Sequence, residues 1–188
     1  MTTIKTDFVL DAKGLACPMP IVKTKKAITG LEAGQVLEVL VTDKGSKADI
    51  KAWAASTGHQ YIGTIEDGDV LKHYIRKASA AEEKTDNTFP HVVSNQDLER
   101  KLGTDITVLD VRETAEFAFG HIPNAISIPL GELENRLSEL NVENEIYVVC
   151  RTGNRSDLAA SKLADRGFGS VYNVVPGMSG WNGSTTSN

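Results

Sequence analysis

The chain has 188 residues, of which 40% are hydrophobic and 24% are charged, and its formal net charge is −5. This length suits one large or two small domains, and the composition is that of a globular protein rather than a disordered or fibrous one. No apolar run approaches the length of a membrane span, and the first residues lack the apolar core of a signal peptide. We therefore expect a cytoplasmic protein without membrane contacts.

Charge is distributed unevenly along the chain. Residues 1–78 hold eleven Lys or Arg against nine Asp or Glu, whereas residues 79–188 hold nine against sixteen. Residues 78–90 have little apolar surface to bury and end in proline, which is typical of a linker. We predict that this linker joins two domains, residues 1–77 and 91–188.

The first domain shows the element order βαβαββ. Two helical patterns cover residues 18–31 and 47–56. Strand patterns cover residues 8–10, 36–41, 61–65 and 70–75. The last two strands form a hairpin that we expect to turn at Asp67-Gly68, a favoured pair in tight turns. This order predicts a two-layer α+β sandwich with two helices on one face of a sheet.

Cys17 precedes the first helix, in the stretch Cys17-Pro18-Met19-Pro20. Because proline is favoured at the first helical position, we expect Cys17 at or near the helix N-cap. The helix dipole and the free N–H groups would stabilise a thiolate there, which makes Cys17 a candidate nucleophile. A capping cysteine with a structural role is the alternative.

The second domain has an α/β pattern. Ser94 is a candidate N-cap for a helix that carries Leu98 and Leu102. Near-continuous β-rich runs, typical of central parallel strands covered on both faces, occupy residues 106–109, 146–149 and 171–175. An amphipathic helix is predicted over residues 130–140.

Cys150 stands between the second of these β-rich runs and a helical pattern. A strand that leads through a tight loop into a helix directs backbone N–H groups toward one point, which favours anion binding. With Arg151 and Arg155 beside it, Cys150 is expected at the mouth of this loop with a lowered thiol pKa. Arginines at a helix N-terminus oppose its dipole, which favours a bound anion. A buried, unreactive cysteine is the alternative.

Two stretches of this half resemble the rhodanese family, sulfurtransferases that carry a persulfide on a cysteine. The first contains Leu109-Asp110-Val111-Arg112, Glu116-Phe117 and residues 120–125, and the second contains residues 150–156, Pro176-Gly177-Met178 and Trp181. The resemblance implies an α/β rhodanese-like domain with a central parallel sheet. It departs at Asn124, where many members have glycine, and the chain after Trp181 leaves room for only a short or disordered last element.

This resemblance implies that Cys150 carries the persulfide and that Arg151 and Arg155 favour its anionic forms. The backbone N–H groups of residues 151–155 would hold the outer sulfur or the substrate anion. Asp110 and Arg112 would shape the site. The remaining residues of the anion-binding loop are Thr152, Gly153, Asn154 and Ser156.

The first half resembles the TusA-type sulfur carriers, also called SirA-like, over about residues 7–77. The resemblance rests on Cys17-Pro18-Met19-Pro20, on Asp11 and Gly14 before it, and on the order of the elements. It implies that Cys17 carries sulfur as a persulfide, with Pro18 and Pro20 shaping the helix start.

The two resemblances together predict a sulfurtransferase. Thiosulfate or a donor persulfide would load Cys150, and sulfur would pass to or from Cys17 through contact between the domains, for delivery to a thiol or sulfur-carrier protein. No cofactor is expected, and no metal, since the histidines show no ligand-like clustering. Direct nucleic-acid binding is not predicted, because aromatic residues do not interleave with the basic ones.

Two other classes of protein remain as alternatives, a non-catalytic persulfide-binding or regulatory module and a cysteine-based phosphatase or arsenate reductase. In related phosphatases five residues separate the cysteine from its arginine, whereas four separate Cys150 from Arg155. The smaller loop fits a sulfur atom better than a tetrahedral phosphate, which favours sulfur transfer.

Overall fold

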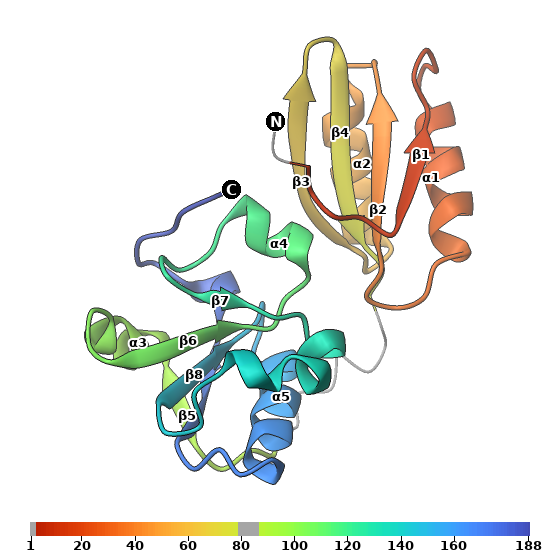
Figure 1. The fold of residues 1–188 in the computed structure, drawn as a ribbon. Helices are drawn as coiled ribbons and strands as arrows, with labels where there is room; N and C mark the ends of the chain where they lie inside the picture. Colours follow the sequence, from red (N-terminus) through yellow and green to blue (C-terminus); the bar gives the residue numbers. More distant parts are fainter. Residues whose placement is uncertain (1–2, 79–86) are drawn as a thin grey trace. The chain divides into compact units, whose positions relative to one another are not determined.

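The computed structural model describes residues 3–78 and 87–188, and the chain divides into two compact units, Met1–Ala81 and Glu82–Asn188 (Figure 1). Most of the expected linker, residues 79–86, lies outside the described residues. The end of the expected linker belongs instead to the second unit. Phe89 is part of that unit's core, and its N–H donates to the Asp157 carboxylate at 2.9 Å.

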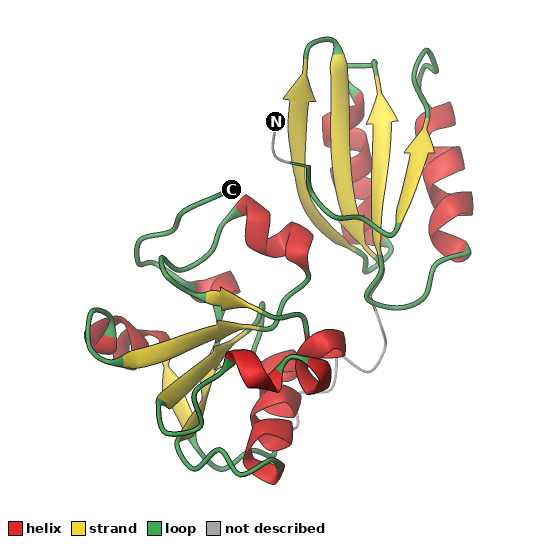
Figure 2. Ribbon diagram, in the orientation of Figure 1, coloured by secondary structure: helices red, strands yellow, loops and turns green. Residues whose placement is uncertain are grey.

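The first unit has the expected order βαβαββ. Its helices are α1 (Met19–Thr29) and α2 (Ser46–Ser56), and its strands are β1 (Phe8–Asp11), β2 (Val36–Val41), β3 (Gln60–Asp67) and β4 (Val70–Arg76). The sheet order is β1-β2-β4-β3, with β1 parallel to β2 and the other two pairs antiparallel. Figure 2 shows both helices on one face of the sheet, which confirms the two-layer α+β prediction.

The core of this unit lies between the sheet and the two helices. Leu37 and Val39, two positions apart on β2, pack in one cluster with Ile28 of α1 and Ile50 of α2. Residues two apart on a strand face the same side, so the alternation along β2 directs these side chains toward the helices.

The ends of α1 and the position of the hairpin turn differ from the expected ones. Helix α1 begins at Met19 with Pro18 as its N-cap, and it ends at Thr29. The hairpin turns at Gly68-Asp69, one residue later than expected, because Asp67 still pairs with Val70. Gly68 has φ +61, a backbone conformation that glycine adopts without a steric penalty.

The second unit is built on a five-stranded sheet in the order β5-β9-β8-β6-β7, and each neighbouring pair is parallel. Its strands are β5 (Val92–Ser94), β6 (Ile106–Asp110), β7 (Ile126–Ser127), β8 (Glu145–Val149) and β9 (Val171–Val175). Its helices are α3 (Asn95–Lys101), α4 (Thr114–Phe119), α5 (Asn154–Asp165) and the 3-10 helices η2 (Leu130–Asn135), η3 (Leu137–Glu139) and η4 (Met178–Gly180). The three β-rich runs occupy the centre of the sheet, which confirms the expected central parallel strands.

Both faces of this sheet are covered. Ile146 and Val148 of β8 belong to a cluster with residues of α5 and η2, whereas Tyr147 and Val149 belong to a cluster with Leu98 of α3. Successive strand residues point to opposite faces, so a strand covered on both sides is apolar at every position. This explains why β8 shows a continuous apolar run.

The α-helix expected over residues 130–140 is wrong, because the segment forms the 3-10 helices η2 and η3. Arg136 has φ −121 and interrupts the helical backbone. Gly131 and Asn135 also have low α-helix propensity. Leu133 nevertheless packs in the core, so the apolar pattern reported burial and not the type of helix.

Other short elements were missed or underestimated from the sequence. Strands β5 and β7 and helix α4 are two to six residues long and carry too few periods to be recognised. Ser94 is the N-cap of α3, as expected, and forms a capping box with Asp97.

The residues after Trp181 are not disordered, since Thr186 and His121 exchange backbone hydrogen bonds. No helix within the described residues is long and apolar enough to cross a membrane.

Candidate functional site

Cys150 directly follows β8 and precedes helix α5, at the carboxyl end of a parallel sheet, where α/β folds bind ligands. Its side chain is 1% exposed, so the thiol lies beneath the loop and not at its mouth as expected. Sγ accepts a hydrogen bond from the Gly153 N–H at 3.1 Å and lies 3.3 Å from Ser156 Oγ. The backbone therefore directs a donor at the sulfur, which stabilises negative charge there.

Two glycines allow the chain to close around this cysteine. Gly153, the N-cap of α5, has φ +99, and a Cβ there would lie 2.7 Å from Val175 Cγ1. Gly177 has φ +81, and a Cβ there would overlap the carbonyl oxygen of Cys150. The Met178 N–H donates to that same oxygen at 2.8 Å. The stretch Pro176-Gly177-Met178 therefore fixes the backbone of Cys150.

A buried hydrogen-bond network extends from the sulfur to β9. Ser156 Oγ donates to Asn173 Oδ1 at 2.6 Å, and Asn173 Nδ2 donates to the Gly153 carbonyl at 3.2 Å. Because the Ser156 proton is directed at Asn173, the Ser156 oxygen is free to accept the S–H of Cys150. Sequence reasoning missed Asn173; the signal was a single polar residue within the apolar run Val171–Val175.

The two arginines of the loop have different surroundings. Arg155 is 6% exposed, and its guanidinium donates to the Glu116 carboxylate at 2.7 and 2.9 Å. Its charge is therefore paired with a carboxylate of α4, and its effect on an anion at the loop stays a prediction. Arg151 is exposed to solvent. Glu116 belongs to the rhodanese-like stretch, but its role as the partner of Arg155 was not predicted from the sequence.

The remaining loop residues differ in exposure. Thr152 is exposed, Asn154 is half-buried, and Ser156 is buried. The loop therefore presents Thr152 to solvent, while Ser156 stays beneath it beside the sulfur.

Asp110 and Arg112 form a second buried ion pair at the carboxyl end of β6. Arg112 Nε and Nη2 donate to the Asp110 carboxylate at 2.9 to 3.1 Å and 2.6 Å, and Nη2 also donates to the Gly120 carbonyl at 2.8 Å. This pair ties β6 to the end of α4. Asn124, farther along this segment, has φ +64, a left-handed conformation that asparagine tolerates better than most residues.

Cys17 lies in the first unit, directly before the N-cap Pro18 of α1, and it is exposed. Its S–H donates to Asp49 Oδ2 of α2 at 3.4 Å. This hydrogen bond raises the pKa of the Cys17 thiol, and desolvation and the charges of Asp49 and Asp43 raise it further. The direction of this pKa shift is therefore opposite to the one expected from the helix N-terminus.

Cys17 borders a shallow depression between the two helices. Its other lining residues are Pro20, Ile21, Asp43, Ser46 and Asp49. Pro20 is buried in the first turn of α1, whereas Pro18 is exposed. Both prolines lie at the helix start, and Pro20 contributes an apolar wall beside the thiol.

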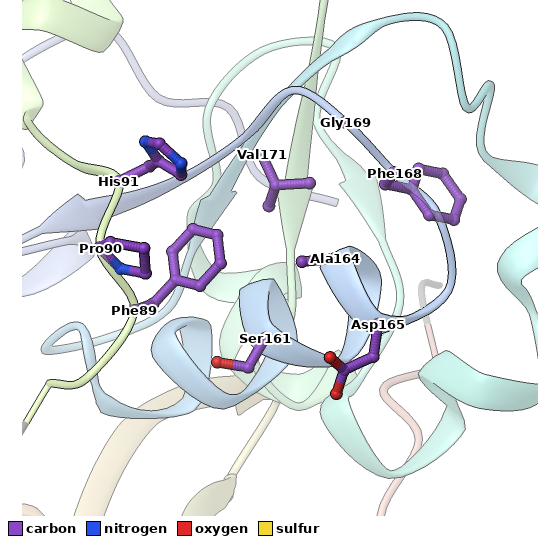
Figure 3. A pocket seen from close by; sticks show the side chains of 9 residues that line it. All are labelled: Phe89, Pro90, His91, Ser161, Ala164, Asp165, Phe168, Gly169 and Val171. Carbon is purple, nitrogen blue, oxygen red and sulfur yellow. The ribbon is translucent and has the colours of Figure 1, made fainter.

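A separate cavity of about 320 Å³ lies along the carboxyl-terminal half of α5 (Figure 3). Its lining residues are Phe89, Pro90, His91, Ser161, Ala164, Asp165, Phe168, Gly169 and Val171. Residues 150–156 do not line it, so it is distinct from the Cys150 site.

Comparison with known proteins identifies both units. The family described as "Sulfurtransferase TusA" matches residues 8–77, and the family described as "Rhodanese-like domain" matches residues 94–184. These two matches define the chain as a sulfur-transfer protein. The chain belongs to the TusA and rhodanese-like families, with one domain of each.

Several relatives share one or both domains. "Putative sulfur carrier protein YrkF" of Bacillus subtilis is 50% identical over 184 residues, which is 97% of this chain and 99% of that protein. "Putative sulfur carrier protein YrkI" of the same organism is 60% identical over 74 residues, 39% of this chain and 99% of that protein. A crystal structure of a rhodanese-related protein from Thermoplasma volcanium is 32% identical, with a TM-score of 0.49, over 52% of this chain and 99% of that one.

Proposed function

We propose that this protein is a persulfide sulfurtransferase in which Cys150 receives sulfane sulfur from thiosulfate or a donor persulfide. Sulfur is then relayed to or from Cys17 and delivered to a thiol or to a sulfur-carrier protein. The observation that carries the proposal is the position of Cys150 Sγ, which accepts the Gly153 N–H at the start of α5. The description of YrkF as a sulfur carrier supports the same chemistry.

Loading from thiosulfate is a displacement at sulfur. The Cys150 thiolate attacks the outer sulfur of thiosulfate, the S–S bond of thiosulfate breaks, and sulfite leaves with the bonding electron pair. The product is Cys150–S–S⁻. The Gly153 N–H donates toward the sulfur throughout, and fixed backbone donors of this kind stabilise the negative charge as it moves.

Transfer to Cys17 is a thiol exchange in which, again, one S–S bond forms and one breaks. The Cys17 thiolate attacks the outer sulfur of the persulfide, a new S–S bond forms on Cys17, and Cys150 leaves as a thiolate. A leaving thiolate that is stabilised departs faster, so the N–H directed at Cys150 favours release toward an acceptor. Both cysteines are free thiols, and the chemistry requires a compartment that keeps them reduced, such as the cytoplasm.

Mass spectrometry of the reduced protein after incubation with thiosulfate tests this function. We expect one added sulfur atom on the peptide that contains Cys150, and added sulfur on Cys17 only when Cys150 is present. The matched variants are Cys150→Ser and Cys17→Ser, which replace each sulfur with an oxygen of similar geometry.

Three outcomes separate the alternatives. Sulfur on Cys17 in the Cys150→Ser protein would contradict the relay from Cys150. No added sulfur from thiosulfate or from a small persulfide would contradict the sulfurtransferase. Formation of thiocyanate when cyanide is added would exclude a module that binds sulfur without turnover.

A further inference from the structure

We propose that Asp49 keeps the Cys17 thiol protonated until a cationic side chain of a sulfur donor or acceptor binds the carboxylate, so that Asp49 selects the partners of Cys17. This inference rests on the proposed function, because it assigns a gate to the thiol that would carry the sulfur. The partner is a protein or small molecule with a positive group beside its reacting sulfur.

The first support is the geometry at the thiol. Cys17 is exposed, yet its S–H is not directed at solvent but at Asp49 Oδ2, 3.4 Å away. Among the described residues, Asp49 and Asp43 are the charged groups that act on this thiol; Asp49 lies in the first turn of α2, and Asp43 lies in the loop just before that helix. The α1 side of the depression is formed by Pro20 and Ile21, which carry no charge.

The second support is that the acidic side of the depression is anchored in the core. Ser46 is buried, and its hydroxyl donates to the Asp43 carbonyl at 2.6 Å. Ser46 Oγ also lies 3.2 Å from Nε2 of the fully buried His73. On its other side, His73 Nδ1 lies 2.9 Å from the Tyr61 hydroxyl. This network fixes the first turn of α2, and therefore the backbone that carries Asp49.

The consequence for reactivity follows from charge. A thiolate beside a carboxylate is disfavoured by repulsion and by the loss of the S–H donor to that carboxylate. A cation paired with Asp49 removes both effects, the proton passes to solvent, and the Cys17 thiolate attacks the outer sulfur of the partner's persulfide. The partner's inner sulfur leaves as a thiolate, which completes the exchange. An anionic partner would gain no such assistance.

The pH dependence of Cys17 alkylation by iodoacetamide tests the gate in the Cys150→Ser protein, where Cys17 is the remaining cysteine. Asp49→Asn keeps an acceptor of similar shape and removes the charge. We expect a lower apparent pKa and an alkylation rate at neutral pH that is higher by about threefold or more. Asp69→Asn, in the β3–β4 turn, is the matched control and should leave the rate unchanged. An unchanged or raised pKa in Asp49→Asn would overturn the proposal.

The choice of partner is tested with small disulfides of opposite charge. Cys17 in the parent should react faster with cystamine, which is cationic, than with dithiodipropionate, which is anionic, and Asp49→Asn should reduce this preference. An equal preference in both proteins would contradict selection by Asp49. Neither measurement involves sulfane sulfur, so the gate and the proposed function can fail separately. A shifted Cys17 pKa in Asp49→Asn, together with no loading of the protein by thiosulfate or persulfide, would refute the proposed function and leave the gate intact.

Discussion

Arg155 of α5 and Glu116 of α4 form a buried ion pair with two short hydrogen bonds, and this pair joins the first turn of α5 to the segment that follows β6. The arginine that lies five residues after Cys150 therefore acts on the position of the loop. Arg151, the other arginine of this loop, is exposed to solvent.

Removal of one partner from this ion pair should destabilise the second domain. Glu116→Ala leaves the Arg155 charge buried, and breaking a buried pair in this way costs about 3–5 kcal/mol. We expect a lower midpoint of urea unfolding, measured by the fluorescence of Trp181 in a Trp53→Phe background, since Trp53 lies in the first unit. The combined variant Glu116→Leu and Arg155→Met should recover part of that loss, because it removes both charges together, while the hydrogen bond that Glu116 accepts from the Glu113 N–H stays lost. If the double variant recovers stability and its Cys150 is loaded from thiosulfate at the parent rate, the ion pair acts on the position of the loop alone.

Gly177→Ala should impair both stability and sulfur loading. The backbone there has φ +81, and the new Cβ would overlap the Cys150 carbonyl oxygen, so the segment that holds Cys150 must move. We expect a loss of about 2 kcal/mol or more in the free energy of unfolding, measured by denaturant titration. Gly131→Ala is the control, since open space surrounds that position and its φ is not positive. Equal effects of the two substitutions would contradict this account.

Ser156→Ala should slow the loading of Cys150, because it loosens the network that holds the backbone N–H donor against the sulfur. The hydroxyl bridges the thiol and Asn173 Oδ1, and its removal takes the hydrogen bond from a buried amide oxygen. This should cost about 1–3 kcal/mol of stability, and the rate of persulfide formation measured by mass spectrometry should fall. Ser161→Ala on the same helix removes only a hydroxyl that donates to the Asp157 carbonyl, and we expect it to load normally.

Acidification should destabilise the first domain through His73. Burial lowers the pKa of His73 to about 4, below the ordinary value of 6.5. As the pH falls below 6.5, the unfolded chain binds a proton that the folded domain does not. Stability present above pH 6.5 is therefore lost toward pH 4, by roughly 3 kcal/mol in total. Hydrogen exchange of the β4 amides at several pH values measures this, and His73→Gln should have a flatter dependence. An identical dependence in the two proteins would exclude His73 as the cause.

The sequence alone was sufficient for the local features of this protein. The βαβαββ order, the three central strands of the second domain and the Ser94 cap all depend on short-range patterns of apolar and polar residues. The two cysteine motifs could be read for the same reason, since each combines a reactive residue with the turn and helix start beside it. The 3-10 geometry of residues 130–140 was not predicted, because an apolar stripe indicates which face of a helix is buried and not whether the backbone is an α-helix or a 3-10 helix.

The partners of the site residues were decided by the tertiary structure. Glu116 meets Arg155 across 39 positions of sequence, and Asp49 meets Cys17 across 32. From sequence, a cysteine before a helix predicts a thiolate, because the helix N-terminus is the charge that can be seen locally. The protonation state depends instead on every charge within a few ångströms, and the fold brings those charges from elements that are distant in the chain.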